Sequence, residues 1–157
     1  MKKLVKFFAV AALLGTLMTT QSCTKTCDAG YEGSDCKTLM TAKFINSNWS
    51  VTESKNGGTP YTYSSSISQS STDISKVLIS KVANQFFNSN VVGTVSNSTT
   101  ITITNQNPDG DNYYITTTGT NAVANNVMTL NYSITGPNGA TPPVTVTDNY
   151  TSTWTHQ

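Results

Sequence analysis

Charged and catalytic side chains are scarce in this sequence of 157 residues. Only 11% of the residues are charged, Arg is absent, and His156 is the single His. So little charge excludes a coiled coil and a charged disordered tail. The nine Lys are matched by eight acidic residues, which leaves no basic surface for nucleic acid. Because His156 lies at a chain end, where side chains are usually solvated, we expect no general base there, no cofactor and no enzymatic activity.

The N-terminal part of the chain, residues 1–22, has the layout of a secretory signal. Its apolar run, Phe7 to Met18, is too short to span a bilayer comfortably. The basic start consists of Lys2, Lys3 and Lys6. Removing residues 1–22 therefore takes away three of the nine Lys and leaves six against eight acidic residues. The rest of the chain has the length of one domain.

The signal ends at Ser22, and Cys23 follows it directly. This ending resembles a bacterial lipoprotein signal of the relaxed Bacteroidetes type, in which a small residue precedes a lipidated Cys. The resemblance implies that Cys23 carries acyl chains that hold the protein to a membrane. Since Thr24 follows, and not Asp, it further implies the outer membrane, with the protein facing the periplasm or the cell surface. The alternative is a simple secretory signal, but lipidation of Cys23 leaves an even pair of cysteines.

The two remaining cysteines flank a short segment, Cys27-Asp-Ala-Gly-Tyr-Glu-Gly-Ser-Asp-Cys36. This segment resembles the closing half of an EGF-like module. The resemblance implies a disulfide between Cys27 and Cys36. A full module has six cysteines, so its calcium and receptor binding are not implied here. We interpret residues 23–38 as a lipid-anchored stalk with a partial EGF-like disulfide loop, and we expect no metal because no His lies nearby.

Residues 39–157 alternate apolar and polar side chains, with turn residues about every ten positions, which predicts an antiparallel all-β domain. Short sequential hairpins favour an up-and-down barrel over a two-sheet sandwich. Phe86 and Phe87 interrupt the pattern and predict either a loop plug or a single helical turn. The meander has about eight strands, which begin near residues 44, 61, 74, 91, 99, 113, 127 and 144.

The order of these features also resembles a group of small Bacteroidetes lipoproteins, in which a Gly-Tyr-Glu-Gly knot precedes a Lys-Phe, Trp, Val and Glu segment. The matching parts here are Gly30 to Cys36 and Lys43 to Glu53. The stretch around Trp49 is similar to the first strand of lipocalin-like (calycin) barrels, in which a Trp closes one end. Ser47 replaces the Gly of that motif, and no Arg is present to pack on the Trp. The resemblance implies a calycin-like barrel and a location in the cell envelope, but it implies no activity.

Two hypotheses for function follow from these patterns. The first is a non-enzymatic, lipid-anchored envelope protein, a structural or binding module that contacts an envelope glycan or another protein. The alternative is a calycin-like carrier of a small apolar ligand. The aromatic residues that we expect to line such a cavity or to close the barrel are Trp49, Tyr63 and Trp154.

Two further groups of polar residues have to be weighed as sites. Glu53 and Asp148 form a carboxylate pair only if the first and last strands adjoin, as barrel closure requires. The loop from Asn107 to Asn112 gathers oxygen atoms of the kind that calcium takes, but it lacks the Glu of an EF-hand. We expect neither a catalytic pair nor a metal site.

Overall fold

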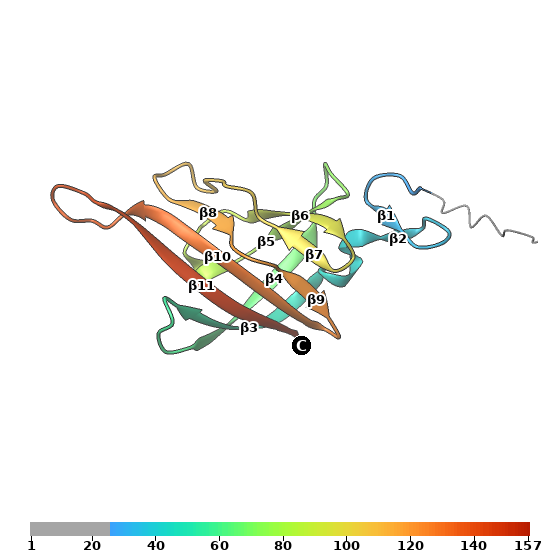
Figure 1. The fold of residues 1–157 in the computed structure, drawn as a ribbon, viewed down its shortest axis with the longest axis horizontal. Helices are drawn as coiled ribbons and strands as arrows, with labels where there is room; N and C mark the ends of the chain where they lie inside the picture. Colours follow the sequence, from blue (N-terminus) through green and yellow to red (C-terminus); the bar gives the residue numbers. More distant parts are fainter. Residues whose placement is uncertain (1–25) are drawn as a thin grey trace, which may run out of the picture.

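Eight antiparallel strands close into an up-and-down barrel in the computed structural model, which describes residues 26–157 (Figure 1). The strand order around the barrel is β11-β3-β4-β5-β6-β7-β9-β10, and β10 pairs with β11 to close it. The prediction of an all-β barrel preceded by a small disulfide loop is confirmed. The elements are β1 (Tyr31–Glu32), β2 (Thr38–Leu39), the 3-10 helix η1 (Met40–Lys43), β3 (Asn46–Lys55), β4 (Tyr61–Gln69), β5 (Lys76–Ile79), α1 (Val82–Gln85), β6 (Val91–Asn97), β7 (Thr100–Thr102), β8 (Tyr114–Thr117), β9 (Ala122–Ala124), β10 (Val127–Pro137) and β11 (Thr145–His156).

The last strand is longer than the part of it that closes the barrel. β11 pairs with β10 from Thr145 onward, but with β3 only from Tyr150 onward. The β10–β11 hairpin therefore projects beyond the barrel body, at the left of Figure 1. We call this projecting part, residues 136–147, the arm.

One position in the barrel is shared by two short strands. β8 and β9 both pair with β10, β8 near its end and β9 near its start. The sequence predicts a strand near 113–118 followed by a turn, and it misses β9. The interruption is stabilised by Asn121, whose buried side-chain oxygen accepts the main-chain N–H of Asn131. A side chain thus replaces the bond that a continuous strand would supply to β10.

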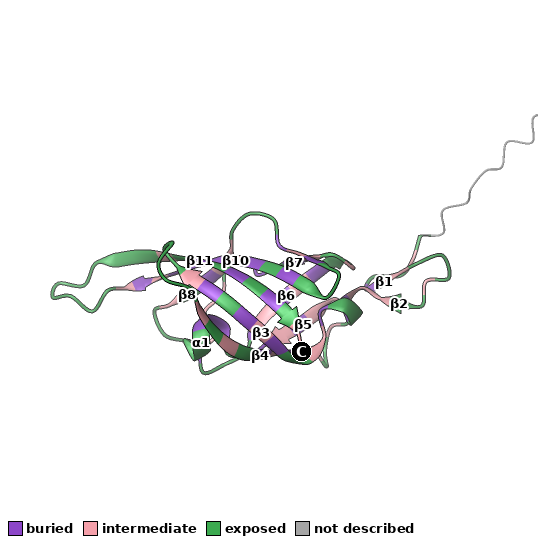
Figure 2. Cartoon of the chain, turned by 90° about the horizontal axis from the view of Figure 1, so that it is seen from below, coloured by how far each residue is buried: buried purple, intermediate pink, exposed green. Residues whose placement is uncertain are grey.

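The barrel interior is packed with apolar side chains. Figure 2 shows buried and exposed residues alternating along β10 and β11, as expected for strands with one face inward. Thr and Ser occupy many of the outward positions, where β-branched polar side chains suit a solvated sheet. The fully buried side chains include Phe44, Trp49, Ile67, Ile79, Ile101, Ile103, Ile115, Met128, Leu130, Tyr132 and Trp154.

Three apolar residues lie differently from the strand pattern. Phe44 caps η1 rather than beginning a strand, and it is fully buried. Ile74 lies in the β4–β5 turn, outside the strand predicted to begin there. The single turn α1 precedes Phe86 and Phe87, of which Phe87 is buried and Phe86 is 42% exposed. The backbone of α1 is not that of a regular right-handed helix, because Ala83 and Asn84 have positive φ angles of 51° and 53°. The segment therefore fits the loop plug better than the helical turn, and Phe87 is the ring that fills the core.

The disulfide loop with the strands β1 and β2, residues 27–39, which we call the knot, is fixed to one end of the barrel. The main-chain N–H of Met40 donates to the Gly30 oxygen at 3.0 Å, and the Ser98 N–H donates to a Glu32 carboxylate oxygen at 3.0 Å. Ile74 covers Gly30 so closely that a Cβ there would lie 2.5 Å from Ile74 Cγ1. The knot thus contacts the β4–β5 and β6–β7 turns, while the arm projects from the opposite end (Figure 1).

Within residues 26–157, no helix is both long enough and apolar enough to cross a membrane.

Candidate functional site

The end of the barrel opposite the knot holds a cavity of about 330 Å³. Its lining comes from the end of β3, the residue after α1, the loop before β8, and both strands of the arm. We call it the mouth pocket. It is lined by Lys55, Phe86, Tyr113, Ile134, Gly136, Pro137, Asn138, Val146 and Asp148. Ile134, Gly136 and Val146 continue the inward-facing rows of β10 and β11, so the pocket lies on the concave face of the sheet.

One wall of the mouth pocket is aromatic and held in place. The ring of Tyr113 packs on the backbone of Gly136, where a Cβ would lie 2.1 Å from Tyr113 Cδ1. The Tyr113 hydroxyl donates to the Pro137 oxygen at 2.9 Å. Phe86 meets Tyr113 edge to face, with ring centroids 5.1 Å apart. This wall is therefore largely formed before any ligand arrives, which lowers the entropic cost of binding.

The other wall carries an ion pair. Lys55 Nζ lies 2.7 Å from Asp148 Oδ2, and the Asn56 side-chain amide donates to Asp148 Oδ1 at 2.8 Å. The hydrogen bond from Lys55 lowers the pKa of Asp148, and the same bond raises the pKa of Lys55. The ammonium also lies 6.0 Å from the ring centroid of Tyr150. The mouth pocket thus offers an apolar aromatic surface opposite one cation and one anion.

A buried carboxylate lies one step deeper in the barrel than Lys55. Glu53 is 1% exposed and accepts hydrogen bonds from the hydroxyls of Tyr61 at 2.6 Å, Tyr63 at 3.1 Å and Tyr132. Burial raises the pKa of the Glu53 carboxyl, and these hydrogen bonds oppose that rise. Burial also raises the pKa of Tyr63 and Tyr132, beside the Glu53 charge. The cluster is a satisfied polar plug beneath the mouth pocket.

An aromatic stack connects this plug with the pocket. Tyr132 and Tyr150 are parallel, with centroids 4.9 Å apart and an angle of 8° between planes. Tyr132 bonds Glu53, and Tyr150 lies beneath the Lys55 ammonium. The stack therefore seals the interior below the mouth.

The sequence-predicted aromatics divide between two places. Trp49 and Trp154 meet edge to face at 6.4 Å near the knot end, and both are fully buried. Their indole N–H groups donate to Phe44 and Ser152. Tyr63 belongs to the Glu53 cluster instead. None of the three lines the mouth pocket.

His156 is not the solvated chain end that the sequence predicts. It belongs to β11, opposite Trp49, and its ring lies 4.0 Å from the Trp49 ring. Its Nε2 atom is buried without a hydrogen-bond partner among the residues described. The prediction failed because β3 and β10 both pair with β11 down to its end, which orders the terminus.

The remaining sequence candidates occupy separate environments. β3 and β11 do adjoin, but Glu53 lies opposite Ser152 while Asp148 bonds Lys55, so the two carboxylates do not share a site. In the Asn107–Asn112 loop, Asp109 accepts the main-chain N–H groups of Asn88 and Ser89 at 2.9 and 2.7 Å. Its carboxylate therefore ties two loops together.

The cysteine predictions have two outcomes. Cys27 and Cys36 form the expected disulfide, with an S–S distance of 2.08 Å. Cys23 lies outside the described residues, as do residues 1–22, so the lipid anchor stays a prediction.

Sequence reasoning missed most of the mouth pocket. Lys55 shares the parity of Trp49, Val51 and Glu53, so the β3 pattern extended by one step places it on the inner face. Gly136 reads as a turn residue in the sequence, and nothing local reveals that it seats a ring from residue 113. For Phe86 and Phe87 the sequence predicts a loop plug or a single helical turn, and neither alternative makes Phe86 a pocket wall.

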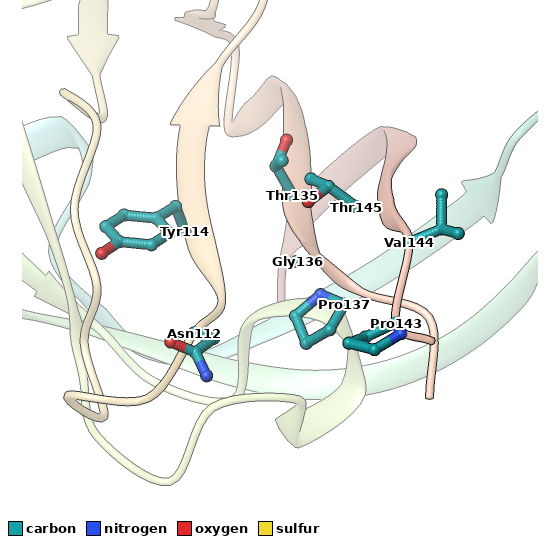
Figure 3. Close-up of a pocket in the computed structure, with 8 residues that line it drawn as sticks. All are labelled: Asn112, Tyr114, Thr135, Gly136, Pro137, Pro143, Val144 and Thr145. Carbon is teal, nitrogen blue, oxygen red and sulfur yellow. The ribbon is translucent and has the colours of Figure 1, made fainter. Parts of the chain in front are cut away.

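A second cavity, of about 350 Å³, lies on the outer face of the arm. Figure 3 shows Pro137 and Pro143 toward the tip of the hairpin, with Thr135 and Thr145 farther along the same two strands and Tyr114 on β8. A third, of about 370 Å³, lies at the knot end beside Lys43 and His156. Of these, only the mouth pocket joins a fixed aromatic wall to a charged one.

No protein-family model matches the chain, and neither does any curated protein or solved structure.

Proposed function

We propose that this protein is a lipid-anchored, non-enzymatic binding module of the cell envelope and that the mouth pocket is its binding site. A β-barrel is compatible with a calycin-like binding module. The observation that carries the proposal is the fixed aromatic wall of Phe86 and Tyr113 facing the Lys55–Asp148 pair across a cavity of about 330 Å³. Such a cavity suits a small amphipathic ligand, with an apolar face for the rings and polar groups for the charges.

The position of the pocket also supports this role. The knot lies at one end of the barrel and the mouth pocket at the other. An acylated Cys23 sits four residues before Cys27, so the anchor holds the knot end near the outer membrane. The mouth pocket then faces away from the lipid, toward the periplasm or the medium, where an envelope glycan or a small amphiphile can enter.

The packed interior favours shallow over deep binding. Trp49, Trp154 and Tyr132 are fully buried in the core, and the Glu53 cluster seals the space beneath the mouth. A carrier of a small apolar ligand, the second candidate, is favoured by the volume of the mouth pocket. Its ligand binds at the mouth and not in a central calyx, and it contacts Lys55 or Asp148.

The absence of catalysis is part of the proposal. The reactive groups near the pocket already have partners: Lys55 and Asp148 bond each other, and Glu53 is bonded by tyrosine hydroxyls. A general base has to be within reach of a substrate proton, and the Glu53 carboxylate is covered by Tyr132 and the Tyr150 ring. These contacts favour holding a ligand over transforming it.

The test uses an anionic aromatic dye, anilinonaphthalene sulfonate, as probe for the full-length protein in detergent below its micelle concentration. Phe86→Ala removes part of the aromatic wall, and we expect it to weaken dye binding about tenfold, the cost of losing roughly 1.4 kcal/mol. Tyr114→Ala is the matched control, since Tyr114 is 44% exposed against 42% for Phe86 but lies on the outer face. Equal dye affinities of the two variants would refute the mouth pocket as the site.

A further inference from the structure

The outer edge of the arm has no strand beside it. Main-chain groups along an antiparallel strand point alternately to its two neighbours. The Asn138 N–H donates to the Val144 oxygen, and the His156 N–H donates to the Asn126 oxygen. The main-chain N–H and C=O groups of the even-numbered residues of β11 therefore point toward β10. The main-chain groups of the odd-numbered residues point to the opposite side, where β3 lies. Pairing with β3 begins only at Tyr150. Thr145 and Thr147 therefore point their N–H and C=O groups toward open space.

Both ends of this free edge are defined. At one end, Asn149 exchanges two hydrogen bonds with Asn56, which occupies its outward main-chain groups. At the other end, Pro143 has no N–H to give. Within residues 26–157, no main-chain partner covers Thr145 or Thr147 on this side.

Apart from its shortness and the neighbouring Pro143, the free edge has none of the usual protection. Natural sheets shield their edges with Lys, with inward charges or with bulges. The residues from Val144 to Thr147 carry no charge, alternate Val with Thr, and are all exposed, with Val144 at 55% and Val146 at 38%. Such an edge is a template for another strand.

We propose that this edge pairs with the same edge of a second copy of the chain, antiparallel and about a two-fold axis through Val146. In this register Thr147 of one copy and Thr145 of the other exchange both of their main-chain hydrogen bonds, and the symmetry repeats the exchange. Val146 then faces Val146 of the second copy in a non-hydrogen-bonded pair. The outward main-chain groups of Thr145 and Thr147 all find partners, while Pro143 falls opposite Asn149, whose groups bond Asn56.

The neighbouring registers fit less well. Centring the axis on Thr145 places Thr147 opposite Pro143, which lacks an N–H. Centring it on Thr147 places Thr145 opposite Asn149, whose groups already bond Asn56. The chosen register also keeps like charges apart, since Asp148 lies opposite Val144 and not opposite another Asp148.

The shape of the arm permits this contact. The arm extends past the barrel body, so two arms can overlap while the barrels stay apart (Figures 1 and 2). The hairpin loop of one copy reaches the β3–β4 turn of the other at Asn56, so the loop has to turn away from the shared sheet before Thr145. Four-residue strands make a small interface, so the dimer is weak and depends on high local concentration.

Antiparallel pairing also places the two knots at opposite ends of the dimer. If the anchor proposed above is correct, the contact joins copies on two facing membranes rather than neighbours on one membrane. The edge pairing itself does not depend on the anchor, because it rests only on the groups of β11.

The first test is cysteine crosslinking of the full-length protein under mild oxidation. Val146→Cys places the two sulfurs across a non-hydrogen-bonded pair, where Cα atoms lie about 4.5 Å apart, within the range of a disulfide. We expect a covalent dimer from Val146→Cys and none from Val127→Cys, the control, which is 40% exposed at the far end of β10. Equal crosslinking of both variants, or none from Val146→Cys, overturns the proposal.

The second test separates edge pairing from random contact. Thr147→Pro in the Val146→Cys background removes an outward N–H that no residue of the described chain uses, and we expect it to abolish the crosslink. Thr147→Ala keeps the N–H and loses only the hydroxyl that bonds Thr135, so its crosslink should persist. A crosslink that survives Thr147→Pro overturns the strand register. If vesicles carrying the wild-type protein fail to cluster while the crosslink forms, the arrangement on facing membranes is wrong.

Discussion

The ring of Tyr113 occupies the space that a side chain at residue 136 would need, since a Cβ on Gly136 would lie 2.1 Å from Tyr113 Cδ1. This contact joins the loop before β8 to the arm and forms one wall of the mouth pocket. A glycine in a strand often marks such a close approach. Here it couples the shape of the pocket to a single position of β10.

Gly136→Ala should therefore disturb both folding and binding. We expect a loss of about 1–3 kcal/mol in the free energy of unfolding, because the Tyr113 ring has to move or the strand has to shift. Urea denaturation measures it. In the double variant with Tyr113→Ala, the glycine substitution should cost little, because the space it needs is free. Costs that simply add would contradict this account of the contact.

Glu53 gives the barrel a distinct pH dependence. Its folded-state pKa is raised, so the folded protein keeps a proton that the unfolded chain has lost, and stability falls as the pH rises above about 4.5. The Glu53→Gln variant has no carboxyl group at this position, so its stability does not depend on this protonation. The stability advantage of the wild type over Glu53→Gln should thus be largest in acid and shrink toward neutral pH. Urea denaturation across this range checks it, and a difference that grows with pH contradicts the raised pKa.

Asp73 has the opposite effect to Glu53 on the pH dependence of stability. Its pKa falls to about 2 because the Ser75 hydroxyl and N–H donate to it and Lys76 lies 3.0 Å away. The stabilisation it gives is present above its unfolded value of 3.8 and is lost as the pH falls through about 2. Asp73→Asn should remove this acid-dependent component. Direct titration by NMR is the measurement, and an ordinary Asp73 pKa contradicts the contact.

Trp154 should dominate the stability of the knot end of the barrel. It is fully buried, meets Trp49 edge to face, and donates to Ser152 at 2.8 Å. Trp154→Ala should cost about 3–5 kcal/mol. Tyr114→Ala, at 44% exposure, should cost far less, so similar midpoints of the two variants in urea would argue against a packed interior.

The sequence predicts the barrel because its pattern is local. Alternation along each strand and short turns fix neighbour pairing. The parity of Trp49 and Val51 also leads to an inward Glu53, a step that our sequence predictions did not take. The hairpin partners of Glu53, Tyr61 and Tyr63, follow from the same reasoning across one turn.

The parts that escape prediction depend on residues far apart in the chain. Tyr132 lies 79 positions from the carboxylate it bonds, and Asn56 lies 92 positions from Asp148. No local pattern encodes such pairs, because they depend on how the barrel closes. β9 was not predicted for another reason: a strand of three residues, Ala122–Ala124, is too short to show a hydrophobic period.

The most direct test of the central claim is native mass spectrometry of the protein released from its own envelope. The account predicts a chain beginning at an acylated Cys23 that carries a small noncovalent ligand, which Phe86→Ala loses and Tyr114→Ala keeps. A bare wild-type protein, or a ligand retained equally by both variants, would contradict the claim that the mouth pocket is a binding site.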